Sequence, residues 1–238
     1  LYVKAPDLPM LDVRVVFDAG SARDGELPGL AKFTNAMLSE GAGVWDADAM
    51  ALRLEERAIQ LGSGSLRDMA WVSLRSLVEP EVLEVALESA AAVLAEPRFD
   101  ADAVARVRQQ MQIGLRRALQ SPARVAKRRF FETLYGDHPY AHDPGGTETS
   151  LAEIGVDDLR AFHQRYYVGA NAVIAIVGAV DRSAAETIAE RVTAGLAAGS
   201  HAEPLPPSPA ASSAELRETF PSSQSHVFVG QNGMARHD

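Results

Sequence analysis

The stretch of residues 20–41, GSARDGELPGLAKFTNAMLSEG, determines how the rest of the chain is interpreted. It opens with a polar turn, places Pro28 where the start of a helix tolerates a missing N–H, and closes with Gly41 at a typical stop position. Three apolar residues recur at helical spacing and are predicted to face inward: Leu30, Phe33 and Met37. The remaining helix surface is then shared by Lys32, Thr34, Asn35 and Ala36. The stretch therefore predicts a short amphipathic helix.

Two motifs resemble those of a known family. The pattern G-S-x-R-D followed by P-G-L-A-x-F-x-x-x-M-L, within residues 20–38, resembles the signature of the pitrilysin/insulinase zinc peptidases, the inverzincins. Residues 135–167 contain Y-G-D-H-P-Y, then G-T, then L-x-x-F-x-x-x-Y-Y, which is similar to a second run of the same family. The resemblance extends from about Val13 to Gly230.

In that family the short helix carries H-x-x-E-H, whose two histidines bind zinc while the glutamate activates water. The resemblance places Lys32 and Ala36 at the histidine positions and Asn35 at the glutamate position. An ammonium group repels a dication, a methyl group donates no electron pair, and an amide is not a base near neutral pH. We therefore expect no catalytic residue and no metal ligand at these positions.

The family also takes a third ligand, a glutamate, from a later helix roughly eighty residues downstream, which falls here at Ile113 and Gly114. Residues 103–131 contain neither Asp nor Glu, so a small shift in alignment does not restore the ligand. The resemblance thus implies a degenerate member that holds no zinc and requires no other cofactor. Zinc is expected only in an active partner.

Composition limits the classes of partner. The 238 residues are 47% hydrophobic with a net charge of -9, which is typical of a globular protein and argues against a nucleic-acid partner. The basic residues between Arg124 and Arg129 are expected to form a solvated helix face rather than a binding patch. Cysteine is absent, which excludes disulfides and thiolate metal sites.

Hydropathy gives no membrane span, because no apolar run approaches about 18 residues. The chain begins abruptly within an apparent strand at Leu1, so we expect it to be a fragment at both ends, and a leader could have been cut away. Compartment is otherwise undetermined, and removal of a leader would favour a periplasmic or extracytoplasmic protein.

The order of predicted elements indicates an α+β fold with a largely antiparallel mixed sheet covered by helices. Two strands at residues 1–4 and 13–17 are expected to form a hairpin, and a second helix begins at Asp46 and ends before Gly62. Helices also begin at Pro80, Asp100, Ser121 and Ser183, the last with a capping box to Glu186. The apolar run 172–177 predicts a central strand covered on both faces. The resemblance narrows this fold to the mitochondrial-processing-peptidase-like metallohydrolases.

Residues 65–78 alternate between apolar and polar side chains and predict a half-buried strand. In the family the matching segment is an edge strand that carries an Asn-Ala pair and pairs with the backbone of the substrate peptide. In this chain Gly62 and Ser63 occupy the positions of that pair. The resemblance thus suggests substrate binding at the edge strand around Gly62, Ser63, Gly64 and Ser65. A flexible turn into a strand is an equally good interpretation of Gly62 and Gly64. An unpaired edge in this region also predicts self-association.

Three histidines invite a functional interpretation. His138 and His142 are four residues apart, but Pro139 prevents the helix that would align them on one metal, so loop histidines bonded within their own turn are expected. His163 is expected at the surface. Gly114 lies within a predicted helix, which indicates close packing or a bend.

Domain boundaries follow from composition and from the resemblance. We expect a peptidase-like domain at residues 1–198, a Pro-rich linker at 199–213, and the start of a second homologous domain at 214–238. A strand pair is predicted in the last segment, near residues 216–220 and 226–230.

The resemblance implies a non-catalytic subunit of a heteromeric zinc metallopeptidase, which forms chamber wall and positions peptide for an active homologous partner. Two alternatives stay open. One is a structural or assembly component derived from an inactive peptidase. The other is an active endopeptidase with an unrecognised site, although the six dispersed histidines show no triad motif.

Overall fold

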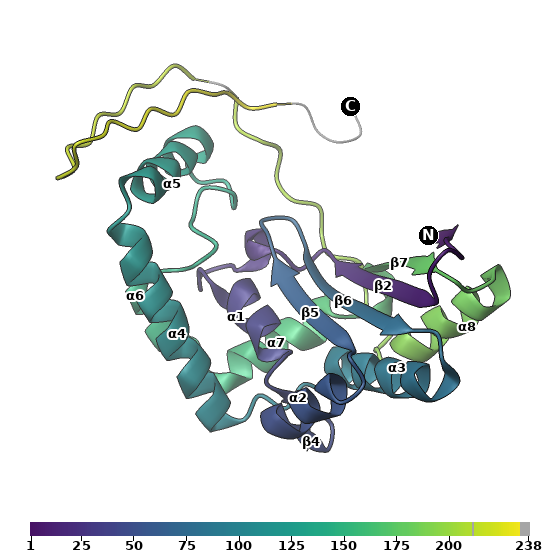
Figure 1. The fold of residues 1–238 in the computed structure, drawn as a ribbon. Coiled ribbons are helices and arrows are strands. Elements are labelled where there is room, and N and C mark those ends of the chain that lie inside the picture. Colours follow the sequence, from purple (N-terminus) through teal and green to yellow (C-terminus); the bar gives the residue numbers. More distant parts are fainter. Residues whose placement is uncertain (211, 234–238) are drawn as a thin grey trace.

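A computed structural model describes residues 1–210 and 212–233 of the chain (Figure 1). Its main feature is a sheet with the strand order β1-β7-β2-β6-β5. The strands are β1 Tyr2–Lys4, β2 Met10–Phe17, β5 Gln60–Ser65, β6 Ala70–Leu77 and β7 Ala172–Gly178. A small separate sheet joins β3 Gly41–Ala42 to β4 Trp45–Asp46. All pairs of the large sheet are antiparallel except β1 with β7, which confirms the predicted mixed, largely antiparallel sheet.

Helices cover one face of this sheet and one end of it (Figure 1). They are α1 Leu30–Met37, α2 Ala47–Glu55, α3 Pro80–Ala95, α4 Ala101–Leu119, α5 Pro122–Tyr135, α6 Glu148–Glu153, α7 Val156–Tyr166 and α8 Arg182–Thr193. Helix α3 contacts β6 and α8, while α1 contacts β5, β6 and α7. Helix α4 packs against α1, α5 and α6, so it lies beyond the α1 end of the sheet. No helix in the described part of the chain is long and apolar enough to cross a bilayer.

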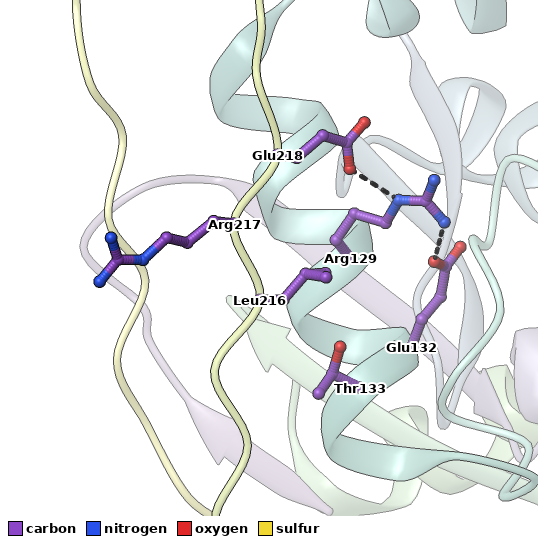
Figure 2. Close-up of a pocket in the computed structure, with 6 residues that line it drawn as sticks. All are labelled: Arg129, Glu132, Thr133, Leu216, Arg217 and Glu218. Carbon is purple, nitrogen blue, oxygen red and sulfur yellow. Dashed lines mark hydrogen bonds and ion pairs between the residues drawn. The ribbon is translucent and has the colours of Figure 1, made fainter.

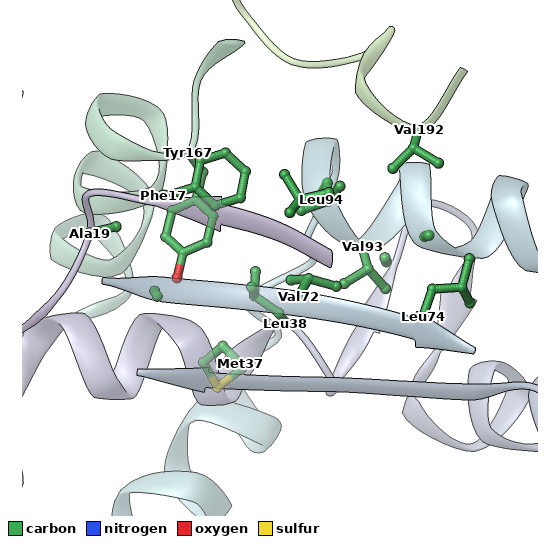
Figure 3. Close-up of a cluster of buried hydrophobic side chains, with 14 of the residues drawn as sticks. Phe17, Ala19, Met37, Leu38, Val72, Leu74, Val93, Leu94, Tyr167 and Val192 are labelled. Atoms are coloured by element: carbon green, nitrogen blue, oxygen red, sulfur yellow. The ribbon is translucent and has the colours of Figure 1, made fainter. Parts of the chain in front are cut away.

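The core lies between the sheet and the helices behind it (Figure 3). Alternate residues of β2 and β6 point into it, because successive side chains of a strand face opposite sides. They are Leu11, Val13, Val15 and Phe17 from β2, with Ala70, Val72 and Leu74 from β6. The period-two pattern therefore predicted the buried face of β6 correctly.

The pairing of β1 corrects the predicted hairpin. Strand β1 pairs in parallel with β7 rather than with β2, with Tyr2 opposite Ile176. Strand β7 lies between them and pairs with β2 along its whole length. A sequence pattern can identify a strand, but it cannot identify a pairing partner some 170 residues away. The short connection between β1 and β2 led to the incorrect prediction that these two strands pair with each other.

Strand β7 also differs from its prediction. Its apolar run indicated a strand covered on both faces, but Val173 is 59% and Val177 39% exposed. Arg14 of β2 is exposed on the same sheet. The helices cover only one face, so the opposite face of the sheet is open in the described structure.

The edge of the sheet lies at β5, not at residues 65–78. Strand β6 is internal because it pairs with both β2 and β5. Helix α2 ends at Glu55, and Ala58 has a φ of 52° that turns the chain into β5. Gly62 and Gly64 therefore lie within a strand and do not end a helix. The helical spacing of apolar residues continues past Glu55 to Leu61, but residues 60–65 pair with β6 as a strand.

Helix starts were predicted to within a residue or two, although some caps differ. Asp46 caps α2 by accepting from the Ala49 N–H, whereas Asp100 makes no capping bond with its side chain. At α8 the cap is Asp181, which accepts from the Ala184 N–H, and not the box at Ser183. Gly114 of α4 has no heavy atom within 4 Å of the place where a Cβ would stand, so close packing does not explain it.

The segment after α8 contains no helix or strand in residues 199–210 and 212–233. The predicted strand pair near 216–220 and 226–230 is therefore absent there. An isolated strand pair is marginal in water without further strands or a packed face, which accounts for the difference. Residue 211 of the predicted linker and residues 234–238 of the predicted second domain lie outside the described residues.

Candidate functional site

The candidate site is the helix α1 together with the adjoining edge strand β5. The helix begins at Leu30, two residues later than the position of Pro28 suggested, and Gly29 precedes it with a φ of 98°. That left-handed conformation suits glycine. Asp24 accepts from the N–H groups of Gly29 and Ala31, both at 2.7 Å, and so caps the helix from a distance. This carboxylate satisfies two backbone donors that a helix start leaves free.

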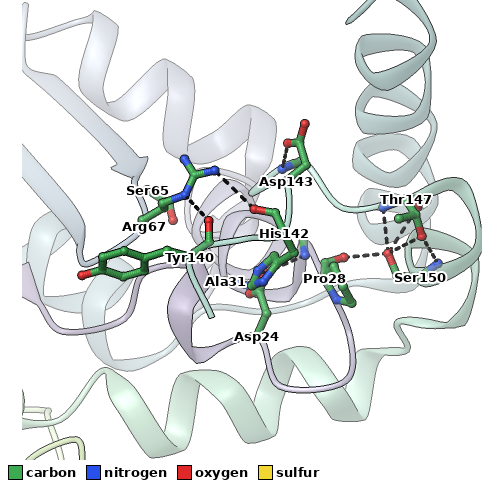
Figure 4. A network of polar contacts seen from close by, with 12 residues as sticks. Asp24, Pro28, Ala31, Ser65, Arg67, Tyr140, His142, Asp143, Thr147 and Ser150 are labelled. Atoms are coloured by element: carbon green, nitrogen blue, oxygen red, sulfur yellow. Dashed lines mark hydrogen bonds and ion pairs between the residues drawn. The ribbon is translucent and has the colours of Figure 1, made fainter. Parts of the chain in front are cut away.

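Asp24 also joins α1 to the loop before α6 (Figure 4). The Nε2 atom of His142 lies 3.0 Å from Asp24 Oδ2, and the Asp24 carboxyl group is fully buried. Burial raises the pKa of Asp24, while its bonds to His142, Ala31 and Gly29 act in the opposite direction. Desolvation is therefore offset in part by three partners that favour the charged form.

The same loop is held to the β5–β6 turn by Arg67 (Figure 4). Its guanidinium group donates to the carbonyl oxygens of Tyr140 at 2.9 Å and His142 at 3.3 Å. It also lies 3.8 Å from the ring centroid of Phe131. Tyr140 is bonded in turn to Asp68, and its pKa is raised to about 12, mainly by burial. The start of α1, the loop and the strand turn thus form one polar network.

The three positions that correspond to the family's H-x-x-E-H residues differ sharply in their exposure to solvent. Lys32 is exposed and Ala36 half-buried, whereas Asn35 is 3% exposed. Thr34 is also fully buried, so it does not share the helix surface as predicted. Only Lys32 and Ala36 remain on the accessible side of the helix.

Asn35 is held inside the protein by its side-chain amide. Its Nδ2 donates to the hydroxyl of Tyr167 at 3.1 Å and to the carbonyl oxygen of Trp71 at 3.4 Å. Tyr167 is fully buried and tilted against Phe17, and burial raises its pKa above the usual value. An amide in this position links α1 to the sheet and to the residue after α7. Its role here is structural support.

Ile113, at the third-ligand position, lies on α4 and is 39% exposed. Helix α4 contacts α1. The Ile113 side chain is a hydrocarbon and donates no electron pair to a metal. Within the described residues, no group of three or more His, Asp or Glu side chains is placed to hold a metal ion.

Strand β5 borders α1 directly. The hydroxyl of Ser63 donates to the carbonyl oxygen of Asn35 at 3.2 Å, which joins the edge strand to the candidate helix. Gly64 lies under the Trp71 ring, and a Cβ there would stand 2.3 Å from a ring carbon. Gly62 is exposed. In the described structure the other side of β5 has no strand partner, so its outward N–H and C=O groups are available.

The three histidines of interest lie in different surroundings. His138 accepts from the Tyr140 N–H at 3.1 Å within its own turn, as predicted, and its Nε2 atom also lies 3.0 Å from the carbonyl oxygen of Pro206. His142 instead contacts Asp24, outside its turn. His163 was expected at the surface, but it is buried and bonded to the carbonyl oxygen of Leu94 at 2.9 Å. Burial lowers its pKa from 6.5 to about 4.

Four residues that organise the site were not predicted to do so: Asp24, Arg67, Trp71 and Tyr167. Arg67, Trp71 and Tyr167 are distant in sequence from their partners, whereas Asp24 lies within seven residues of the N–H groups that it caps. A usable signal existed for Asp24 and Tyr167, because each belongs to a quoted motif, G-S-x-R-D and Y-Y. Arg67 and Trp71 carry no comparable pattern.

Comparison with known proteins agrees with this arrangement. Residues 1–147 match the family described as Insulinase (Peptidase family M16), and residues 153–238 match the Peptidase M16 inactive domain. The chain belongs to the M16 family. It is a degenerate member, because Lys32, Asn35 and Ala36 replace the H-x-x-E-H residues.

Individual M16 relatives support the same reading. The chain is 30% identical over 154 residues to the Non-peptidase homolog YmxG of Helicobacter pylori, a match that spans 64% of this chain and 35% of that protein. A crystal structure of a peptidase M16 inactive domain from Pseudomonas fluorescens matches 87% of this chain and 50% of that one, with 41% identity and a TM-score of 0.86. The chain thus spans half or less of the length of these relatives.

A more distant structure shows the shared fold alone. The periplasmic protease PqqL from Escherichia coli matches 87% of this chain and 24% of its own length, with a TM-score of 0.77 and 18% identity. These matches confirm the predicted fold class and the family. Relatives named as inactive or as non-peptidases support a non-catalytic, peptidase-like protein.

Proposed function

We propose that this chain is the non-catalytic subunit of a heteromeric zinc metallopeptidase. In this role it forms part of the chamber wall and positions peptide substrate for an active homologous partner. The observation that carries the proposal is the contrast at α1. The helix keeps its buried anchors to the sheet and to β5 through Asn35, while Lys32 and Ala36 occupy the ligand positions on its accessible side.

The edge strand supplies a means of handling peptide. Strand β5 borders α1 and exposes an unpaired backbone edge within the described structure. An extended peptide adds to such an edge by main-chain hydrogen bonds, which depend little on the side chains of the strand. The segment Gly62, Ser63, Gly64 and Ser65 is the proposed binding strand. Loss of zinc chemistry leaves this mode of binding intact.

The proposal also predicts that the chain does not bind zinc stoichiometrically. With Lys32, Asn35, Ala36 and Ile113 at the family's positions, we expect less than one-tenth equivalent of zinc per chain by elemental analysis, roughly the level of weak surface binding. The triple change Lys32→His, Asn35→Glu and Ala36→His should still give no peptidase activity, since a carboxylate near 113 is missing. About one zinc per wild-type chain, or activity from the triple variant alone, would contradict this part.

A location outside the cytoplasm also belongs to the proposal, because a related fold occurs in a protein described as a periplasmic protease. Fractionation of cells that express the complete gene would test it. Recovery in the cytoplasmic fraction would count against it.

The central test is co-expression with a homologue that keeps an intact H-x-x-E-H and the downstream glutamate. We expect a stable complex by size-exclusion chromatography and faster peptide hydrolysis than the partner alone achieves. A Glu→Gln change in the partner's motif serves as the control, since it should abolish hydrolysis and leave the complex intact. If no complex forms and the partner is equally active alone, an assembly or scaffold role replaces the proposal.

The edge strand can be tested within that complex. Gly62→Pro and Ser63→Pro each remove one backbone N–H from adjacent positions of β5, and only one of the two faces β6. The proline at the inward N–H should lower stability. The proline at the outward N–H should keep stability but reduce peptide hydrolysis by the complex, with Ser63→Ala as the side-chain control. Equal activity in both proline variants would exclude substrate pairing at β5.

A further inference from the structure

Positive charge is strongly concentrated on the helical hairpin formed by α4 and α5. Eight of the 23 lysines and arginines lie in residues 103–131, a segment without any acidic residue. The rest of the chain therefore sets 15 basic residues against 32 acidic ones. The hairpin is a separate basic surface on an acidic protein.

Part of this charge is already partnered within the fold. Arg106 pairs with Glu40 and Arg116 with Glu148, while Arg108 donates to two carbonyl oxygens at the end of α6. The remaining exposed cations lie around the turn between the two helices. They are Arg117, Arg124 and Lys127, none of which forms an ion pair with another described residue. These three define the free basic face.

The structure also shows which kind of group helix α5 accepts. Residues 212–233 run beside α5 in an extended conformation, and Figure 2 shows Glu218 reaching back to Arg129, with an Oε2–Nε distance of 2.9 Å. Farther along the segment, Phe228 lies against Phe130 with ring centroids 6.1 Å apart. A hollow of about 540 Å³ separates helix and segment around Arg129 and Leu216. An extended segment with a carboxylate and an aromatic ring thus packs on α5, the helix that also carries Arg124 and Lys127 of the free basic face.

A buried polar atom on the same helix lacks a partner. The Nε atom of Arg128 is inaccessible and makes no hydrogen bond with any described residue, although Glu132 lies 3.6 Å from it. The Arg128 guanidinium group thus adds a positive charge on the helix that carries Arg124 and Lys127, and Arg binds carboxylates with directed N–H bonds.

We propose that the α4–α5 basic face binds acidic, aromatic-containing extended segments of polypeptide and thereby selects such segments as substrates. This inference rests on the proposed function, since it names the class of peptide that the non-catalytic subunit would capture. A nucleic acid fits less well. A long polyanion would extend from the small basic face onto an acidic remainder that repels it, whereas a short acidic segment matches the face alone.

The test is binding of labelled peptides to the full chain by fluorescence anisotropy. One probe is a peptide rich in glutamate and phenylalanine, and the second replaces each glutamate with lysine. We expect the acidic peptide to bind and its affinity to fall as salt rises, because exposed charges are screened. The lysine peptide should bind at least about tenfold more weakly, as like charges oppose association.

Charge reversal locates the site. Arg124→Glu with Lys127→Glu should weaken binding of the acidic peptide at least about tenfold. The matched control is Arg160→Glu with Arg165→Glu, which changes the net charge equally on exposed positions of α7 and should weaken binding less than about twofold. Circular dichroism checks that both double variants fold.

Several results would overturn the inference: equal binding of the two peptides, equal loss in both double variants, or tighter binding of a single-stranded oligonucleotide than of the acidic peptide. Failure of the proposed function would be visible separately, because it is measured by complex formation and hydrolysis with a partner. Acidic-peptide binding that persists without such a complex would support the surface and contradict the subunit role.

Discussion

The two sides of helix α1 differ in how completely their residues are partnered. On the buried side, Asp24 caps the helix and contacts His142, and Asn35 joins Tyr167 and Trp71. On the accessible side, Lys32 and Ala36 occupy the family's ligand positions and make no side-chain hydrogen bond with other described residues. The buried side of α1 is therefore anchored by polar bonds, whereas the side chains at the two histidine positions form none with the described residues.

This difference follows from what each side contributes to stability. A buried polar group that loses its partner costs about 1–3 kcal/mol, so residues of the supporting network are difficult to replace. Exposed ligands contribute little to folding once the metal is absent. We therefore expect large effects from changes to the network and small effects from changes at the ligand positions.

The largest effect is expected at Asp24. Asp24→Ala leaves the N–H groups of Gly29 and Ala31 without their acceptor and removes the contact with His142, so unfolding free energy should fall by about 3–5 kcal/mol. Urea denaturation measures it. The control Asp12→Ala breaks an exposed pair with Arg75 and should cost less than about 1 kcal/mol. Similar losses in the two variants would remove the distinction between buried and exposed sides.

A pH dependence of nearly the same size is expected from His163. Its folded-state pKa of about 4 lies below the usual 6.5, so the unfolded chain binds the proton more readily between these values. Stability should therefore fall as pH drops through 6.5 and approach its full loss, about 3 kcal/mol, near pH 4. The raised pKa of Asp24 has the opposite effect, because its protonation in the folded protein favours folding as the pH falls into the acidic range.

The comparison is the stability difference between pH 7 and pH 4.5 for the wild type and His163→Phe, which keeps a ring beside Tyr167. We expect a smaller pH dependence in the variant. His226→Gln, at an exposed position, should behave as the wild type does. If the stability of His163→Phe fell by as much between pH 7 and pH 4.5 as that of the wild type, burial of this histidine would not be the cause of the pH dependence.

A loss of stability of intermediate size is expected on the buried side of α1 but not on its accessible side. Asn35→Ala removes the partner of the buried Tyr167 hydroxyl and should cost about 2 kcal/mol, whereas Lys32→Ala should stay within about 0.5 kcal/mol. A double-mutant cycle with Tyr167→Phe isolates the pair, and its coupling energy should exceed about 0.5 kcal/mol. A cost at Lys32 equal to that at Asn35 would contradict the proposed division.

The smallest effect is a gain in stability beside the third-ligand position. Gly114→Ala should stabilise α4 by up to about 1 kcal/mol, because a Cβ there meets no atom and alanine favours the helix. Gly29→Ala is the matched control, since its φ of 98° and the Gly146 backbone 3.1 Å from the added Cβ should make it destabilising. A loss of stability at Gly114 would indicate that glycine is required there.

Local patterns in the sequence predicted much of the fold. Alternation identified the buried face of β6, helical spacing identified the inward face of α1, and Asp46 was recognised as a cap. The helix that begins at Asp100 was also predicted, and Ile113 lies on it as α4. These signals are short in range and depend on residues that lie close together in the chain, which is why they can be read without coordinates.

Tertiary structure decided what depends on distant partners. In the folded protein β1 pairs with β7 instead of β2, and the edge strand is β5 rather than residues 65–78. His163 is buried and bonded to the carbonyl oxygen of Leu94. Likewise, Asn35 is an internal anchor only because the fold brings Tyr167 beside it. The sequence by itself determined which chemical groups α1 carries and which it lacks. Only the packing of distant segments determined which of those groups face the core and which stay accessible, because burial depends on partners that no local pattern specifies.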